Sequence, residues 1–234
     1  FKGLPESKEG RSGKAPYEKE TAEFSPEERA EIVKHIIGHG SSNNVDRMYG
    51  AFKTEELNLM IANSEGIHKS STMTNANLTS TAIADWDNDQ GFGWSEACSY
   101  NVNNIDYMDV ARTAVEKGLN NMNTKSIDLG EYTVVLEPLA VQLMLMYFGF
   151  MGFSSRSVQE ERSFMNGKFG EHIVDERVNI YDDALDDDMV GFPFDYEGVP
   201  KQRVDIIKDG VANDVVYDSY TAGRDEEDKE STGH

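Results

Sequence analysis

The chain has 234 residues, of which 38% are hydrophobic and 10% aromatic, and this is enough to bury the core of a folded soluble protein. Its 43 acidic residues against 22 basic ones give a formal net charge of −21, so the chain repels phosphate backbones and anionic lipid headgroups. This charge argues against direct binding to nucleic acid or to a membrane. The single cysteine, Cys98, excludes an internal disulfide framework and indicates a reducing, cytoplasmic compartment.

The first part of the chain predicts an extended lead-in followed by a helix. Residues 1–24 are polar and rich in Gly, Pro, Lys and Glu, without the pattern of a signal peptide. At Ser25 the residue types of a helix start appear, with Pro26 at the first helical position and Glu28 placed to close a capping box. Apolar residues on one side of this helix continue to a Gly-rich end near residues 38–40.

Residues 46–100 change to the pattern of short strands, and a helix follows. We expect strands at residues 48–52 and 57–61 on either side of a polar turn, and β-branched residues predict another over 70–84. Apolar residues near helical spacing then predict a helix over 106–120.

The second half of the chain mixes one apolar helix with short strands. Alternating residues predict a strand at 131–136, and Pro138 begins the longest apolar run. That run, 139–153, is shorter than the roughly 18 to 20 residues of a membrane span, so we expect a buried helix. Further predictions are an amphipathic helix at 157–165 and strands at 178–181, 204–207 and 215–217.

Strands and helices thus come in blocks, which predicts an α+β fold with antiparallel β-sheets, packed helices and one buried apolar helix. We divide the chain into a lead-in (1–24), a helix and β-rich segment of an N-terminal domain (25–130), and a central to C-terminal segment (131–234).

Three candidate metal sites have ordinary alternatives. His35 and His39 share a helix face, but no Glu activates water between them, and the alternative is a helix C-terminus that favours cations. Asp85, Asp87, Asp89 and Glu96 follow EF-hand spacing, yet the required glycine is one place late. The alternative there is a polar hairpin tip between strands at 79–83 and 97–102. A solvated charge run is the alternative to weak cation binding for the acidic cluster Asp182, Asp183, Asp186, Asp187 and Asp188.

No catalytic residue can be assigned from motifs, because nucleophile and phosphate-binding patterns are absent.

An ordered set of short sequence motifs nevertheless resembles one family. Residues 194–200, Phe-Asp-Tyr-Glu-Gly-Val-Pro, precede Gln202-Arg203, then Ile-Lys-Asp-Gly-Val at 207–211, residues 218–222 and Ser-Thr-Gly-His at 231–234. Together with residues 1–5, 62–66 and 167–171, they are similar to landmarks of the TldD/PmbA family of peptide-processing metallopeptidases. We expect scaffold roles for the signature residues Asp195, Glu197, Gly198, Pro200, Arg203, Asp209, Gly210, Ser231, Thr232 and Gly233.

One departure from the family decides what the resemblance implies. In zinc-bearing members the helix after the strand like 131–136 carries His-Glu-x-x-x-His, and a downstream cysteine completes the zinc site. Here the helix reads Pro-Leu-Ala-Val-Gln-Leu-Met-Leu-Met-Tyr-Phe over 138–148, which offers Zn²⁺ no ligand, and Cys98 lies upstream. The chain therefore resembles the PmbA/TldE-like subunit, with no cofactor of its own and zinc expected in a TldD-like partner.

Three functions remain open on this resemblance. The first is a non-catalytic subunit of a heteromeric peptidase that processes unfolded peptides. The second is a self-sufficient metallopeptidase with ligands outside this segment, and the third is a protein-interaction module, as in the family's older name, modulator of DNA gyrase. We also expect the family's N- and C-terminal flanks to be missing, and the acidity hints at salt adaptation.

Overall fold

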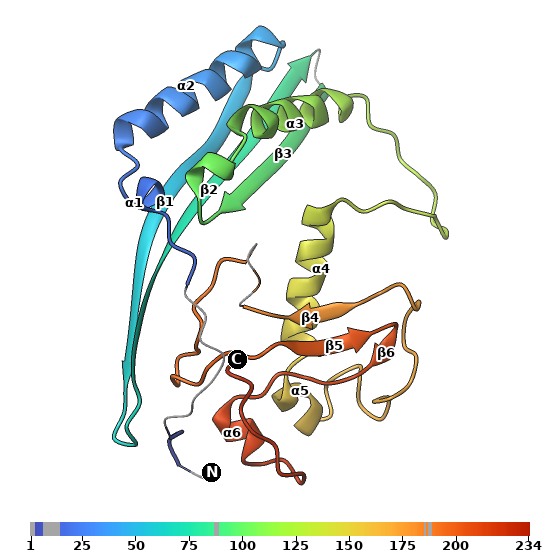
Figure 1. Ribbon diagram of the computed structural model, residues 1–234. Helices are drawn as coiled ribbons and strands as arrows, with labels where there is room; N and C mark the ends of the chain where they lie inside the picture. Colours follow the sequence, from blue (N-terminus) through green and yellow to red (C-terminus); the bar gives the residue numbers. More distant parts are fainter. Residues whose placement is uncertain (1–2, 7–14, 87–88, 185, 187–188) are drawn as a thin grey trace. The chain divides into compact units, whose positions relative to one another are not determined.

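The computed structural model describes residues 3–6, 15–86, 89–184, 186 and 189–234. It divides into two compact units (Figure 1). The helix–sheet unit consists of Pro16–Asn58 and Thr72–Gly130, and the C-terminal unit consists of Phe1–Ala15, Leu59–Ser71 and Glu131–His234. The tip of one long hairpin, Leu59–Ser71, is therefore assigned to the unit that residues 131–234 build.

The helix–sheet unit is a three-stranded sheet with helices on one face. The strands are β1 (Arg47–Ala62), β2 (His68–Trp86) and β3 (Asp89–Ser99), in the order β1-β2-β3. β2 and β3 are antiparallel, with Ala76 opposite Ser99 and Trp86 opposite Asp89. Every second residue of β2 from Thr74 to Ala84 is buried, as expected for a strand with one covered face.

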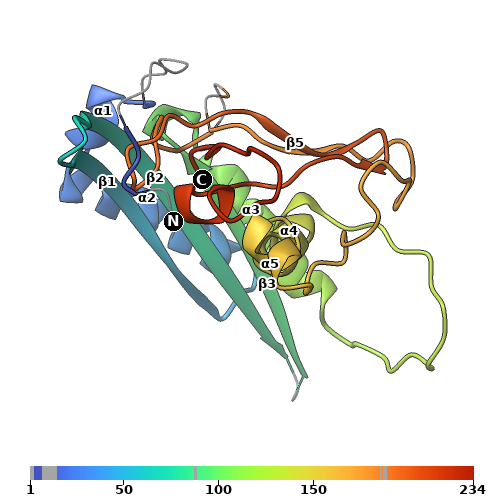
Figure 2. The ribbon, with the colours of Figure 1, turned by 90° about the horizontal axis from the view of Figure 1, so that it is seen from below.

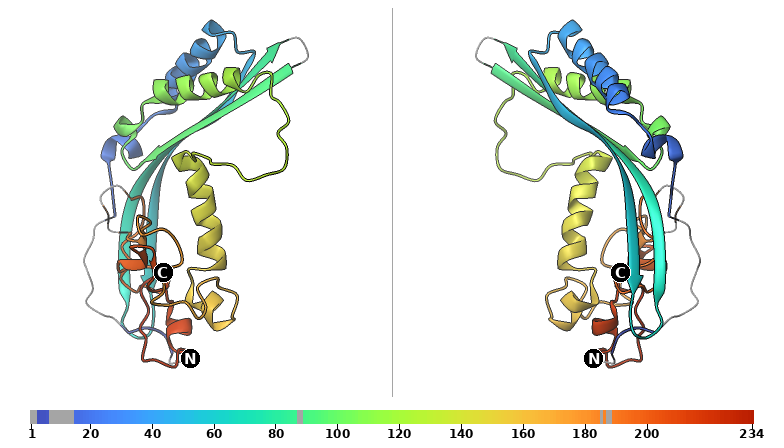
Figure 3. Two further views of the ribbon diagram at one scale, coloured as in Figure 1. Left: turned by 90° about the vertical axis from the view of Figure 1, so that its right-hand side faces the viewer. Right: turned by 90° about the vertical axis from the view of Figure 1, so that its left-hand side faces the viewer.

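Two long helices, α2 (Pro26–Ser42) and α3 (Tyr107–Asn120), cover that face (Figure 3). The short elements α1 (Lys19–Ala22) and η1 (Val102–Asn104) flank them. The predicted capping box is confirmed: Glu28 N donates to Ser25 Oγ at 3.2 Å, and Ser25 N donates to Glu28 Oε2 at 2.8 Å. Ile36 of α2, Leu78 of β2 and Val110 of α3 meet in the core of this unit.

The predicted pair of short strands in residues 48–61 is wrong, because β1 is one strand of 16 residues. Residues 53–56 are polar, and polarity alone suggested a turn. They contain no Gly, Pro, Asn or Asp, the residues that supply turn geometry. Lys53, Glu55 and Glu56 are exposed and half-buried Thr54 accepts a hydrogen bond from Arg29, so the strand accommodates its polar side chains without bending.

The C-terminal unit contains a second antiparallel sheet in the order β4-β5-β6: β4 (Ile180–Asp182), β5 (Val204–Lys208) and β6 (Val211–Ala212). Its helices are α4 (Pro138–Met151), α5 (Ser155–Gln159) and α6 (Ser219–Ala222). The core gathers buried side chains from β5, β6, α6 and the segments between the elements: Phe153, Met165, Val204, Ile206, Ile207, Ala212, Val215, Tyr217 and Ala222.

Several expectations for this unit need correction. Residues 131–136 are exposed and form no strand, and Figure 2 shows the segment before α4 as an open loop. The amphipathic helix expected at 157–165 is the shorter α5, because Glu161 has a φ of +56° and ends helical geometry. Residues 215–217 contribute one bridge, Ser154 to Val216, rather than a strand.

The α+β class with antiparallel sheets is confirmed. The predicted burial of the apolar helix is wrong, since α4 forms but none of its residues is buried. In the part of the chain that the structure describes, no helix has the length and apolar character needed to cross a membrane.

Candidate functional site

α4 (Pro138–Met151) is the helix that the family resemblance compares with the zinc-binding helix of zinc-bearing members. Its 14 residues contain no charged side chain, no histidine and no cysteine. Val141, Leu143, Met144, Leu145, Met146, Tyr147, Phe150 and Met151 are all exposed. Aliphatic, thioether and aromatic side chains of this kind do not ligate Zn²⁺, so the donor set of α4 does not fit that ion.

The C-terminal end of α4 is attached to the core by aromatic packing. The rings of Phe148, Phe153 and Phe164 form a triangle with centroid distances of 5.7 to 6.2 Å. A Cβ added at Gly152 would lie 2.3 Å from the Phe164 ring, so this corner has no room for a side chain. The helix is thus held at one end while its apolar surface stays exposed.

The signature segment 194–200 forms a tight turn around the carboxylate of Asp195. Asp195 Oδ1 accepts hydrogen bonds from Glu197 N at 2.9 Å and Val199 N at 2.8 Å, and Asp195 N donates to Val199 O at 3.0 Å. Gly198 has a φ of +79°, and a Cβ there would lie 2.5 Å from Ile67. Only glycine therefore suits both the backbone angle and the contact with the hairpin tip.

The second oxygen of Asp195 is buried and has no hydrogen-bond partner among the described residues. This burial raises the pKa of Asp195, and the two backbone N–H groups only partly oppose the rise. Lys69 of β2 lies over the Phe194 ring at 5.9 Å, and burial lowers the pKa of its ammonium. Sequence reasoning missed Lys69, because a lone lysine in a strand carries no motif.

Glu197 holds backbone in place, whereas Arg203 contacts other side chains. Glu197 Oε2 accepts from Ser219 N at 2.9 Å, beside the capping box of α6 formed by Asp218 and Thr221. Arg203 contacts neither Asp195 nor Glu197 by ion pair. It pairs with Asp205 at 3.0 Å and stacks on Tyr181, 3.8 Å from the ring centroid.

Asp209-Gly210 is a two-residue hairpin turn between β5 and β6, with Lys208 opposite Val211. Both turn residues have positive φ, +49° and +76°, as a type I′ turn requires. A Cβ at Gly210 would lie 2.6 Å from Val174 O, so the neighbouring segment also requires glycine there.

Residues 231–234 attach to the backbone of Tyr217. Thr232 Oγ1 accepts from Tyr217 N at 2.8 Å, and Ser231 Oγ donates to Tyr217 O at 3.2 Å. A Cβ at Gly233 would lie 2.4 Å from Pro200 O, which joins this segment to the signature turn. His234 Nε2 lies 3.1 Å from Asp182 Oδ1, and this pairing lowers the pKa of Asp182.

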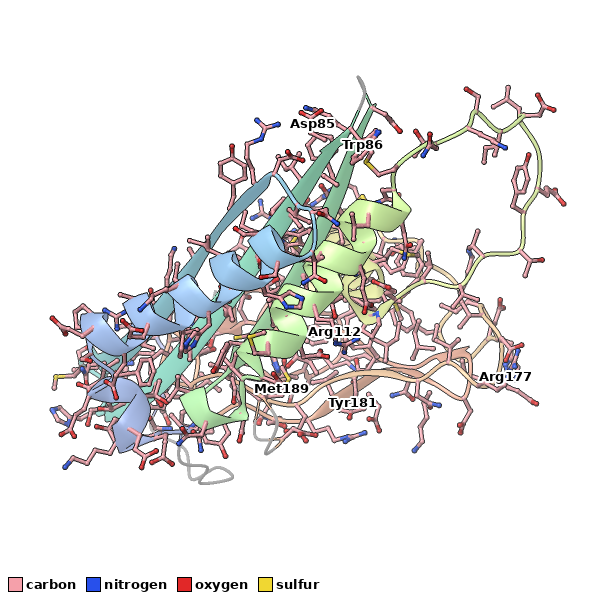
Figure 4. All side chains as sticks on the ribbon, turned by 90° about the horizontal axis from the view of Figure 1, so that it is seen from above. Asp85, Trp86, Arg112, Arg177, Tyr181 and Met189 are labelled. Carbon is pink, nitrogen blue, oxygen red and sulfur yellow. The ribbon has the colours of Figure 1, made fainter. Side chains whose placement is uncertain are left out.

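The candidate cation sites do not converge. Asp85 accepts from Gln90 Nε2 at 2.8 Å at the end of the β2–β3 hairpin (Figure 4), where Asp87 lies outside the described residues. Asp89 and Glu96 stand on one strand seven residues apart, about 23 Å along β3, so they cannot share an ion.

The other two candidates give no metal site either. His35 stacks on Tyr107, with ring centroids 6.2 Å apart. Asp187 and Asp188 of the acidic cluster are outside the described residues. Within the described chain no three His, Cys, Asp or Glu side chains are grouped to hold a metal.

Both parts of the chain match models of one family. The "PmbA/TldA metallopeptidase central domain" matches residues 19–122, and the "PmbA/TldA metallopeptidase C-terminal domain" matches residues 129–234. The chain belongs to the TldD/PmbA family. Among curated proteins, it is 33% identical over 141 residues to the uncharacterized protein MJ0231 of Methanocaldococcus jannaschii, covering 60% of this chain and 33% of the relative.

Solved structures share the fold of this family member over nearly its whole length. A Thermotoga maritima protein named as a modulator of a DNA gyrase (TM0727) superimposes with a TM-score of 0.89 at 24% identity, covering 99% of this chain and 54% of the other. TldE from Thermococcus kodakarensis gives a TM-score of 0.80 at 22% identity, covering 100% and 53%. The chain thus spans about half the length of these solved proteins and a third of MJ0231.

Proposed function

We propose that this chain is a non-catalytic, PmbA/TldE-like subunit of a heteromeric TldD-type metallopeptidase that processes unfolded peptides in the cytoplasm. The observation that carries the proposal is the composition of α4. At the place where zinc-bearing relatives have His-Glu-x-x-x-His, the chain has only apolar side chains, glycine, proline and one glutamine. A zinc-bearing TldD-like partner would then supply the metal and the activated water.

The role of this chain would be to shape the peptide chamber and to hold the peptide as an extended strand. Two features support that role. Glu197 of the signature turn accepts a hydrogen bond from Ser219 N, and Gly233 lies close against Pro200 O, so these segments suit a rigid wall. The apolar residues of α4 suit a surface that contacts another polypeptide, because such residues are enriched in interface cores.

The test uses this chain, a TldD-type subunit with the zinc motif, and both together. Cleavage of an unfolded casein is followed by mass spectrometry, and zinc per chain is measured by elemental analysis. We expect cleavage only with both chains, and zinc only in the TldD-type subunit. A partner variant with its motif Glu changed to Gln is the control for catalysis.

Two results would contradict the proposal and support the alternatives. Stoichiometric zinc and cleavage by this chain alone would make it a self-sufficient metallopeptidase. Stable binding to a protein other than a peptidase subunit, with no effect on cleavage, would make it a regulatory interaction module.

A further inference from the structure

A groove lies between α2 and β1 in the helix–sheet unit. It has a volume of about 250 Å³. Val33, Ile36 and Ile37 line it from α2, and residues 48–51 line it from β1. Behind Gly50 the groove reaches Leu78, Thr79 and Ser80 of β2. None of the groove-lining residues is charged. Val33 and Ile37 stand one helical turn apart and are 36% and 49% exposed, so they form an open apolar rim.

The strand beside this groove is at the edge of its sheet. In the order β1-β2-β3, β1 has one neighbour, and no described strand pairs with its other edge. Natural edge strands are usually protected by charges, proline or bulges. Arg47 and Lys53 provide charges before and after the groove, but residues 48–52 have neither charge nor proline.

The strand edge and the groove together define the kind of occupant. An added strand would pair its backbone with β1, and alternate side chains would then point to the face that α2 covers. A volume of about 250 Å³ is below the 300 to 1,000 Å³ typical of small-molecule sites and fits one or two aliphatic side chains. The net charge of −21 disfavours an acidic peptide, and the positive charge of Arg47 beside the groove is offset by its ion pair with Asp85 at 3.5 Å.

We propose that an extended, neutral or basic peptide with alternating aliphatic side chains binds along residues 48–52 of β1, with one of those side chains in the α2–β1 groove. This inference rests on the proposed function, in which the chain holds unfolded peptide, and it names the edge and the side-chain preference. Main-chain hydrogen bonds would supply much of the affinity, and the groove would select the side chain.

The test measures binding to the chain alone, without a partner subunit. The probe is the acetylated and amidated peptide Lys-Thr-Val-Thr-Val-Thr-Val-Lys, titrated by calorimetry. We expect binding, with slower hydrogen–deuterium exchange at residues 48–52. The same peptide N-methylated at alternate residues keeps its side chains but loses the edge hydrogen bonds, so it should not bind. A version with Asp in place of Val and Lys should not bind either.

The groove is tested with the double variant Val33→Ala, Ile37→Ala, which truncates the rim and keeps good helix formers. Loss of this apolar contact should weaken probe binding by about tenfold. The matched control is Leu119→Ala on α3, where Leu119 is 39% exposed and outside the groove, and its affinity should not change.

Several outcomes would overturn the inference. These are equal binding of the N-methylated peptide, an unchanged affinity in the double variant, or a β1-mediated dimer in sedimentation that leaves no edge for the probe. Partner-dependent casein cleavage would remain a separate result. If the probe binds but cleavage needs no partner, only the proposed function fails.

Discussion

α3 and α4 have 14 residues each, and they differ in composition and in burial. α3 carries Asp, Arg, Glu and Lys, yet it buries Val110, Ala111, Ala114, Val115 and Gly118. α4 has no charged residue and buries none. The difference shows that burial depends on a complementary surface more than on the apolar content of the helix itself.

The surface that α3 packs against is shaped by glycine. At Gly93 of β3, an added Cβ would lie 2.0 Å from Ala114 O and 2.2 Å from Gly118 N. Small residues on both elements let the backbones approach closely, and the apolar stripe of α3 then fills the remaining space. At Gly149 of α4, an added Cβ would meet nothing within 4 Å.

The largest expected effect tests this close approach. Gly93→Ala should separate α3 from the sheet and lower the free energy of unfolding by about 3 kcal/mol or more, because backbone atoms cannot move aside as a side chain can. Urea denaturation followed by circular dichroism measures the change. Gly38→Ala in α2, where a Cβ meets nothing within 4 Å, is the control and should not destabilise. A loss below 1 kcal/mol at position 93 would contradict the account of α3 packing.

A second pair of variants compares the side chains of the two helices. Val115→Ala removes a side chain that is 3% exposed and should cost about 2 kcal/mol of unfolding free energy. Leu143→Ala on α4 removes one that is 54% exposed and should cost less than about 0.5 kcal/mol. If Leu143→Ala costs as much as Val115→Ala, α4 is covered in solution and the comparison fails.

Gly149→Ala is expected to stabilise the chain by about 1 kcal/mol, because alanine has the higher helix propensity and the site is open. The thermal midpoint should rise accordingly. Gly152→Ala at the end of the same helix is the contrast, since its Cβ would meet the Phe164 ring, and that midpoint should fall. A fall for both variants would show that the exposed face of α4 is packed.

The smallest effect concerns pH and the unit that contains α4. Burial raises the pKa of Asp195, so the folded state holds its proton to higher pH than the unfolded state does. The contribution of Asp195 to the free energy of unfolding is therefore complete below its unfolded pKa of about 3.9. This contribution is lost as the pH rises through the raised pKa of the folded state. Asp195→Asn keeps an oxygen acceptor and removes the ionisation.

The variant should show a flatter dependence of unfolding free energy on pH across that window than the unchanged chain. Asp109→Asn, at an exposed carboxylate on α3, serves as the control for a general change in charge. Identical slopes for the Asp195 variant and the unchanged chain would contradict the assigned cause of the pKa shift.

Local patterns predicted the parts of the fold that depend on neighbours in sequence. The capping box of α2, the helix α3 and the Asp209-Gly210 turn follow from side-chain spacing and backbone preference alone. The family resemblance also depended on short ordered motifs, and it was confirmed over both halves of the chain.

Features that depend on distant partners were not predicted. The continuous β1 was missed because a long hairpin tolerates polar residues that resemble a turn. The segment 131–136 has a strand pattern, but a strand needs a neighbouring edge for its backbone, and none of the described strands pairs with it. The α2–β1 groove has no sequence signal, since Val33 and Gly50 come together only when the helix lies over the strand.

The sequence by itself determined the acidity of the chain, the helix caps, the glycine turns and the absence of zinc ligands from α4, because each is a property of residues close together in the chain. Only the tertiary structure decided that the apolar helix α4 stays exposed, that β1 has one neighbour among the described strands, and that one buried oxygen of Asp195 has no hydrogen-bond partner among the described residues. These properties depend on surfaces from distant residues meeting, and no local pattern records whether such a surface exists.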